Sequence, residues 1–149
     1  MRVFRIARAA FPALDGEGAR LTGGRWNSAG TAVVYAGTSR SIAALETLAL
    51  ADPDLLPDDL TIFEIEVPDA LSAERIDLAS LPGDWRAPGH VRCIELGDEW
   101  LRRGASAILP VPSAIIPEEW NVLIDPSHPE GVRVRVVATA PFTFDPRLL

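Results

Sequence analysis

The spacing of hydrophobic positions predicts six short strands. These stretches are rich in β-branched, aromatic or alternating apolar residues. They cover residues 1–7, 31–36, 60–67, 107–111, 121–124 and 132–139. Residues 12–24 carry Pro12 and several glycines, which predicts a loop.

Two longer stretches have helical spacing. Residues 39–50 lack glycine and proline, and Thr38, Ser39 or Ser41 could cap them. Residues 91–103 are followed by Gly104, a typical helix-ending residue. Many strands with few helices between them predict an α+β fold, a single domain over residues 1–149 with a mixed or antiparallel β core and flanking helices. The sequence has no strand–GxGxxG–helix unit, which argues against a doubly wound sheet.

Glu46 occupies an unusual position in the first predicted helix. At about 100° per residue, the apolar residues Ile42, Leu45, Leu48, Ala49 and Leu50 share one arc, and Glu46 falls inside it. A carboxylate that faces the interior is costly unless it is paired or lines a wet pocket. Periodicity alone leaves two interpretations open, a glutamate in a salt bridge with an arginine and a functional carboxylate.

A glycine-rich tract precedes the second predicted strand. Gly23 and Gly24 come directly before Arg25, and glycines let a backbone turn tightly or approach a ligand closely. The tract could equally be an ordinary turn with an exposed arginine. The next strand contains Tyr35, the only tyrosine, and the helix with Glu46 follows it. An arginine, an aromatic ring and a carboxylate therefore come from consecutive elements that can converge.

Composition narrows the chemistry. The net charge is −7 and all 14 basic residues are arginine, so lysine-based Schiff-base chemistry and a Walker-type phosphate loop are excluded. The acidic balance argues against direct nucleic-acid binding. One cysteine, Cys93, and two separated histidines argue against a metal site. The sequence lacks a signal-peptide pattern and an apolar run of roughly 20 residues, so we expect a soluble cytoplasmic protein without membrane contact.

Several motifs occur in a fixed order along the chain. They begin with Gly23-Gly24-Arg25-Trp26-Asn27-Ser28-Ala29-Gly30, Val33-Val34-Tyr35-Ala36 and Ala43-Ala44-Leu45-Glu46. They continue with Gly97-Asp98-Glu99-Trp100, Val111-Pro112-Ser113-Ala114, Glu119-Trp120-Asn121 and Asp125-Pro126-Ser127-His128-Pro129. Together these motifs resemble the RES domain family, and the resemblance covers nearly the whole chain.

This resemblance implies a fold similar to ADP-ribosyltransferase toxins and an activity that consumes NAD as substrate. Arg25, Tyr35 and Glu46 would be the catalytic group. Ser113 and Asn121 would line the nucleotide pocket, with Arg5 reaching it from the first strand. The resemblance also implies an Xre-like antitoxin as partner, in a larger toxin–antitoxin assembly.

The residue types suit that chemistry. Cleavage of the nicotinamide–ribose bond passes through an oxocarbenium-like state, which the carboxylate of Glu46 can stabilise. Tyr35 offers a flat face to the nicotinamide ring, and Arg25 can bind phosphate or ribose oxygens. We expect an NAD glycohydrolase or phosphorylase that uses water or phosphate as acceptor. A mono-ADP-ribosyltransferase that modifies a cellular protein is the alternative, and a non-enzymatic binding module is a third hypothesis.

Overall fold

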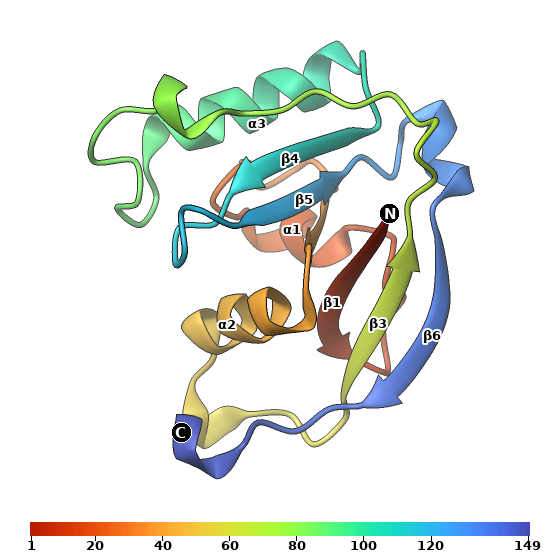
Figure 1. Cartoon of the computed structure of the whole chain (residues 1–149), viewed down its shortest axis with the longest axis vertical. Coiled ribbons are helices and arrows are strands. Elements are labelled where there is room, and N and C mark those ends of the chain that lie inside the picture. The colour runs from red at the N-terminus through yellow and green to blue at the C-terminus, as the bar shows by residue number, and fades with distance from the viewer.

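A single six-stranded antiparallel sheet forms the centre of the computed structural model, which describes residues 1–149 (Figure 1). The strand order is β4-β5-β2-β1-β3-β6. The strands are β1 (Arg2–Arg8), β2 (Val34–Gly37), β3 (Leu60–Glu66), β4 (Ile108–Pro112), β5 (Trp120–Ile124) and β6 (Arg135–Pro141). The helices are α1 (Glu17–Thr22), α2 (Arg40–Leu50) and α3 (Val91–Arg103). The predicted α+β class with an antiparallel core is confirmed.

Three local predictions were wrong. The strand predicted over residues 31–36 begins only at Val34. Residues 12–24, predicted as loop, contain the short helix α1, which is bounded by Gly16 and Gly23 in positive-φ conformations. The two glycines thus flank a helix here instead of excluding one. The last strand begins at Arg135, because Pro129–Arg133 forms a 3-10 helix capped by His128 Nδ1.

The sheet consists of two three-stranded halves that meet at one position. β1 pairs with β2 only at Phe4↔Gly37, whereas β1 and β3 pair along their whole length, from Arg2↔Glu66 to Arg8↔Leu60. Figure 1 shows β4 and β5 in one half and β1, β3 and β6 in the other. Any group that bonds to both halves therefore reinforces a narrow junction.

Hydrophobic clusters lie on both faces of the sheet. One face carries the cluster under α3, built from Trp26, Trp85, Cys93, Trp100, Leu109, Val111 and Leu123. Under α2 the same face carries Phe4, Ile6, Ala43, Leu60 and Phe144. The other face buries residues that include Val3, Val34, Ala36, Ile65, Val122 and Ile124. Burying one such Val, Leu, Ile or Phe side chain stabilises the fold by about 1.5–3 kcal/mol.

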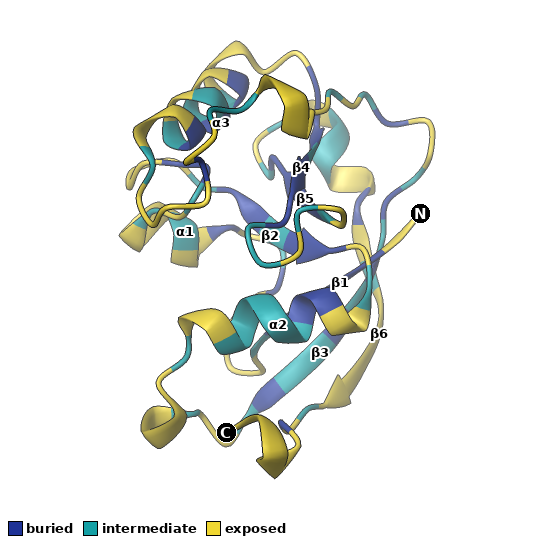
Figure 2. Ribbon diagram, turned by 60° about the vertical axis from the view of Figure 1, so that its left-hand side comes forward, coloured by how far each residue is buried: buried dark blue, intermediate teal, exposed yellow.

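Helix α2 begins directly above β2. Ser39 Oγ accepts a hydrogen bond from Ile42 N at 3.1 Å, which identifies Ser39 as the cap among the predicted candidates. A Cβ on Gly37 would lie 2.9 Å from Ala43 N, so the close approach of the helix requires glycine there. Figure 2 shows the buried part of α2, which contains Ile42 and Ala43, beside β1, and both ends of the helix exposed.

The predicted inward arc of α2 is correct only at its start. Ile42 is buried, and Leu45 and Leu48 are half-buried, but Leu50 is 89% exposed. The last turn runs past the strands, so apolar spacing there does not mark an inward face. None of the helices is long and apolar enough to cross a bilayer.

Candidate active site

The carboxylate of Glu46 receives two hydrogen bonds from residues far away in the sequence. Ser113 Oγ donates to Glu46 Oε1 at 2.7 Å, and Asn121 Nδ2 donates to the same oxygen at 2.6 Å. Glu46 lies on α2, Ser113 directly follows β4, and Asn121 lies on β5. Glu46 forms no salt bridge. The structure thus brings three of the predicted site residues together, with neutral donors in place of an arginine.

Ser113 is held in one orientation by its own turn. Its side chain is completely buried, and its Oγ accepts hydrogen bonds from Ile115 N at 3.1 Å and Ile116 N at 3.2 Å. Because both lone pairs of the hydroxyl are used, its proton is left to point at Glu46. Both donors bind Oε1, which leaves Oε2 of Glu46 available to a ligand.

Tyr35 organises the glycine-rich arginine loop, residues 23–30. Its hydroxyl accepts a hydrogen bond from Trp26 N at 3.0 Å and donates to Asn27 Oδ1 at 2.6 Å. A Cβ on Gly24 would lie 2.7 Å from the Tyr35 hydroxyl oxygen, so this contact requires glycine. Burial raises the pKa of Tyr35, and the Trp26 hydrogen bond opposes this only in part, so the phenol stays protonated.

Tyr35 and Asn121 share one face of the sheet. Gly37, two residues beyond Tyr35 on β2, pairs with Asn121 on β5. Residues two apart on a strand point to the same side, as do directly paired residues. The ring of Tyr35 therefore lies on the side of the sheet from which Asn121 reaches Glu46.

Arg25 contacts a different segment of the chain. Its Nη1 donates to the carbonyl oxygens of Trp85 at 3.2 Å and Ala87 at 3.3 Å. These bonds fix the guanidinium and leave Nε and Nη2 free to donate to an anion. Arg25 makes no hydrogen bond or ion pair with Glu46, so the two catalytic candidates belong to separate groups of contacts.

Arg5 is partly buried beside the β1–β2 junction. Its Nη1 donates to the carbonyl oxygen of Tyr35 at 3.0 Å, while its Nε is buried without a partner. Burial lowers the pKa of the guanidinium, and the Asp15 carboxylate opposes this effect. Because Phe4 pairs with Gly37, strand alternation points Arg5 to the opposite face from Asn121. Arg5 thus contacts the backbone of Tyr35 but not the Glu46 group.

Helix α3 supports the arginine loop from outside. Asp98 accepts hydrogen bonds from Ser28 N at 2.9 Å and Ser28 Oγ at 2.5 Å. A Cβ on Gly97 would lie only 1.6 Å from the carbonyl oxygen of Trp26. The Gly97-Asp98 pair is part of the motifs that resemble the RES domain family, but the resemblance implies no role for these two residues. The pattern that could have pointed to them is a glycine next to an acidic residue inside an otherwise amphipathic helix.

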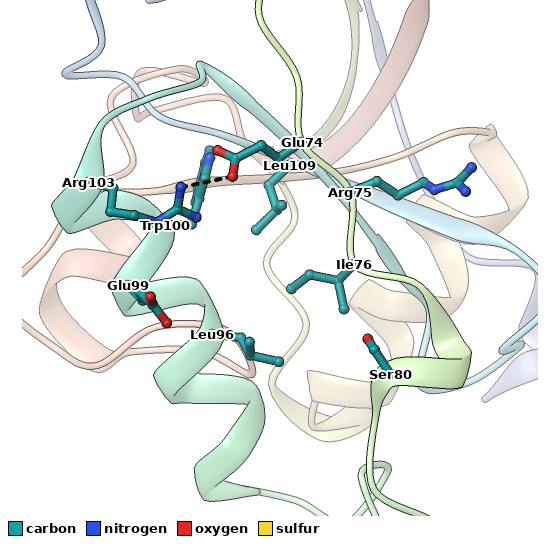
Figure 3. A pocket seen from close by; sticks show the side chains of 9 residues that line it. All are labelled: Glu74, Arg75, Ile76, Ser80, Leu96, Glu99, Trp100, Arg103 and Leu109. Carbon is teal, nitrogen blue, oxygen red and sulfur yellow. Dashed lines mark hydrogen bonds and ion pairs between the residues drawn. The ribbon is translucent and has the colours of Figure 1, made fainter.

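One cleft lies away from these residues. It has a volume of about 230 Å³ and is lined between α3 and residues 74–80 by Glu74, Arg75, Ile76, Ser80, Leu96, Glu99, Trp100, Arg103 and Leu109. Figure 3 shows Arg103 turned toward Glu74, with Nη1 to Oε1 at 2.9 Å, and Arg75 pointing away. The Glu74 carboxylate in this cleft is already paired with Arg103, and none of the predicted site residues lines the cleft. No group of three or more His, Cys, Asp or Glu side chains is arranged to hold a metal ion.

Known proteins match this chain over nearly its whole length. A family model described as "RES domain" matches residues 2–145. The chain is 42% identical over 139 residues to "Prs ADP-ribosylating toxin" of Sphingobium sp. (strain YBL2), covering 91% of this chain and 86% of that protein. It is 37% identical to "Toxin Res" of Photorhabdus laumondii, covering 100% of this chain and 97% of that protein.

The fold is also similar to that of a solved structure. It is the crystal structure of the M. tuberculosis MbcT–MbcA toxin–antitoxin complex. The superposition has a TM-score of 0.79 at 19% sequence identity and covers 95% of this chain and 84% of that chain. At this identity the likeness establishes the fold.

Proposed function

The chain belongs to the RES domain family, and we propose that it is the toxin of a bacterial toxin–antitoxin system that degrades NAD. The reaction cleaves the bond between nicotinamide and ribose, with water or phosphate as acceptor. The observation that carries this proposal is the anchoring of Glu46 through one oxygen by Ser113 and Asn121. The names of the relatives, which include "Toxin Res", support the toxin role.

Glu46 is suited to stabilise a positive sugar. In the transition state the ribose gains positive charge as nicotinamide leaves with the bonding electrons. A carboxylate held by two fixed donors does not have to reorganise, and its second oxygen can bind a ribose hydroxyl. The negative charge then acts on the oxocarbenium ion more strongly than it would in water.

Arg25 supplies positive charge for the pyrophosphate, because its Nε and Nη2 remain free to donate. Arg5 points to the opposite face of the sheet from Asn121, so its role is to hold the backbone carbonyl of Tyr35. A guanidinium can donate two parallel hydrogen bonds to phosphate oxygens. Tyr35, whose hydroxyl proton is already donated to Asn27 Oδ1 in the arginine loop, contributes its ring face to the nicotinamide.

A second candidate function is transfer of ADP-ribose to a protein. The name of the Sphingobium relative, at 42% identity, states that it ADP-ribosylates Prs. The same Glu46 chemistry serves both reactions, because they differ only in the nucleophile that attacks the ribose. The binding-module hypothesis depended on an arginine partner for Glu46, and the carboxylate binds two neutral donors instead.

We also propose an antitoxin as partner, of the Xre-like type that the family resemblance implies. The structural neighbour is a toxin solved with its antitoxin, MbcT with MbcA. Co-purification of this chain with the product of an adjacent reading frame would test the partnership directly.

The decisive experiment measures nicotinamide and the fate of ADP-ribose separately. The purified chain is incubated with NAD, with and without phosphate, and products are identified by mass spectrometry. Free ADP-ribose, or its phosphorylated form when phosphate is present, supports NAD degradation. Nicotinamide release that requires a protein fraction and adds ADP-ribose to one protein supports transfer. NAD that stays intact under every condition would refute both.

A further inference from the structure

Arg86 bonds to the turn that orients Ser113. Its Nε donates to the carbonyl oxygen of Ala114 at 2.7 Å, and its Nη2 donates to the carbonyl oxygen of Ile115 at 3.2 Å. Arg86 lies 27 positions before Ser113, in the segment between Leu78–Ser80 and α3. The two bonds use one edge of the guanidinium fork, a geometry that lysine cannot reproduce.

The two peptide groups held by Arg86 are the same two that bind Ser113. The Ala114 carbonyl and the Ile115 N–H belong to one peptide group, and the Ile115 carbonyl and the Ile116 N–H belong to the next. Both N–H groups donate to Ser113 Oγ, at 3.1 and 3.2 Å. A peptide group is planar and trans, so fixing its oxygen also fixes the direction of its N–H.

A continuous chain of hydrogen bonds therefore runs from Arg86 to Glu46. The guanidinium donates to two carbonyls, their peptide N–H groups donate to Ser113 Oγ, and Ser113 donates to Glu46 Oε1. Donors and acceptors point the same way at each step, so the bonds polarise one another. The positive end of this chain is Arg86 and the negative end is Glu46.

Neighbouring residues fix the backbone of Arg86 although its side chain is exposed. Trp85 is buried against Trp26, with ring centroids 6.2 Å apart. Arg25 Nη1 binds the carbonyls of Trp85 and Ala87, one residue on each side of Arg86. The segment 85–87 thus joins the arginine loop to the serine turn.

We propose that Arg86 is a positioning residue for the Glu46 carboxylate, acting through the two peptide groups and Ser113. It does not touch the substrate. Loss of Arg86 frees the 114–116 turn, lets the Ser113 hydroxyl rotate away and leaves Glu46 with one fixed donor. The catalytic consequence rests on the proposed NAD cleavage, whereas the structural consequence does not.

The test compares Arg86→Gln with Arg92→Gln, an exposed arginine on α3 whose partner is Glu95 at 3.6 Å. In the ligand-free protein, hydrogen exchange at Ile115 and Ile116 should be at least about fivefold faster in Arg86→Gln and unchanged in the control. Nicotinamide release should show a kcat about tenfold lower, the scale of one lost charge-assisted hydrogen bond, with KM within about twofold.

Arg86→Lys should lie between wild type and Arg86→Gln, because an ammonium keeps the charge but reaches only one carbonyl well. This variant also serves if Arg86→Gln folds poorly. Unchanged exchange at Ile115 and Ile116 in Arg86→Gln overturns the proposal, and so does faster exchange with a wild-type kcat. If the wild-type protein does not cleave NAD, the proposed function fails, and the exchange measurement alone decides whether Arg86 orders the turn.

Discussion

Replacing Glu46 by glutamine removes a charge while keeping both hydrogen bonds. Ser113 and Asn121 donate to Oε1, and an amide oxygen in that place accepts from the same two donors. Glutamine matches glutamate in size, so the packing of α2 against the sheet is unaffected. The variant therefore separates the electrostatic role of Glu46 from its structural role.

The expected loss of activity is large. Removing one preorganised electrostatic contact in a transition state costs about 2.7–4 kcal/mol, which corresponds to a rate loss of about 10²–10³. Nicotinamide release at saturating NAD should therefore fall by that factor in Glu46→Gln. Stability should change little, since weaker neutral hydrogen bonds are offset by a smaller desolvation cost.

Glu46→Ala is the matched structural variant. It leaves the hydroxyl of Ser113 and the side-chain amide of Asn121, both buried residues, without their acceptor. A buried donor left unpaired costs about 1–3 kcal/mol. Because water enters part of the vacated space, we expect the free energy of unfolding to fall by about 2 kcal/mol in total. For a domain of this size, this loss lowers Tm by about 4–8 °C.

The test measures Tm by calorimetry and the rate of nicotinamide release on the same preparations of both variants. We expect Glu46→Gln to be stable and inactive, and Glu46→Ala to be less stable and inactive. A Glu46→Gln protein that releases nicotinamide within about fivefold of the wild-type rate would refute the electrostatic reasoning. A Glu46→Gln protein that melts as early as Glu46→Ala would refute the claim that an amide oxygen can serve both donors.

Other substitutions test the supporting contacts. Tyr35→Phe leaves two buried partners unpaired and should lower Tm by about 4–8 °C in a thermal melt; an unchanged Tm would contradict the role of the hydroxyl. Gly97→Ala places a Cβ 1.6 Å from a backbone oxygen of the arginine loop and should destabilise by about 1–3 kcal/mol or more in urea unfolding. Gly83→Ala, which has open space around it, should be neutral, and equal effects would contradict the packing argument. The hydrogen bond from the Ser106 hydroxyl, with a smaller contribution from Arg103, holds the pKa of Glu74 below its usual range. The ionised Glu74 therefore stabilises the fold at neutral pH, and this stabilisation is lost as the pH falls through the lowered pKa. Glu74→Gln should lose stability less steeply in acid than the wild type, and parallel acid-unfolding curves would refute this.

The regular elements could be predicted from local pattern because each has a strong local cause. Helix α3 ends at Arg103 and is followed by Gly104, which adopts a positive φ, as expected for a helix terminus. Helix α1 was missed because its bounding glycines, Gly16 and Gly23, look like loop residues in a sequence. A positive φ angle is a property of the folded backbone, and the spacing of residues along the sequence does not report it.

The site could be predicted only in part. Periodicity placed Glu46 on an inward arc, but it could not distinguish an arginine partner from neutral donors, since both satisfy a half-buried carboxylate. Ser113 and Asn121 were indicated by family resemblance and not by spacing, because they follow Glu46 by 67 and 75 residues. The link through Arg86 involves backbone carbonyls, and no side-chain pattern reports which carbonyls an arginine will reach.

The long separation between Glu46 and its two donors sets an order for synthesis of the chain. Asn121 is made 75 residues after Glu46. At about 5–20 residues per second, this leaves an interval of roughly 4–15 s in which the nascent chain contains the carboxylate but not its partners. A polypeptide released before Asn121 has been added cannot assemble the Glu46 group. Under the proposed function, translation that stops before Asn121 therefore yields a fragment that cannot cleave NAD.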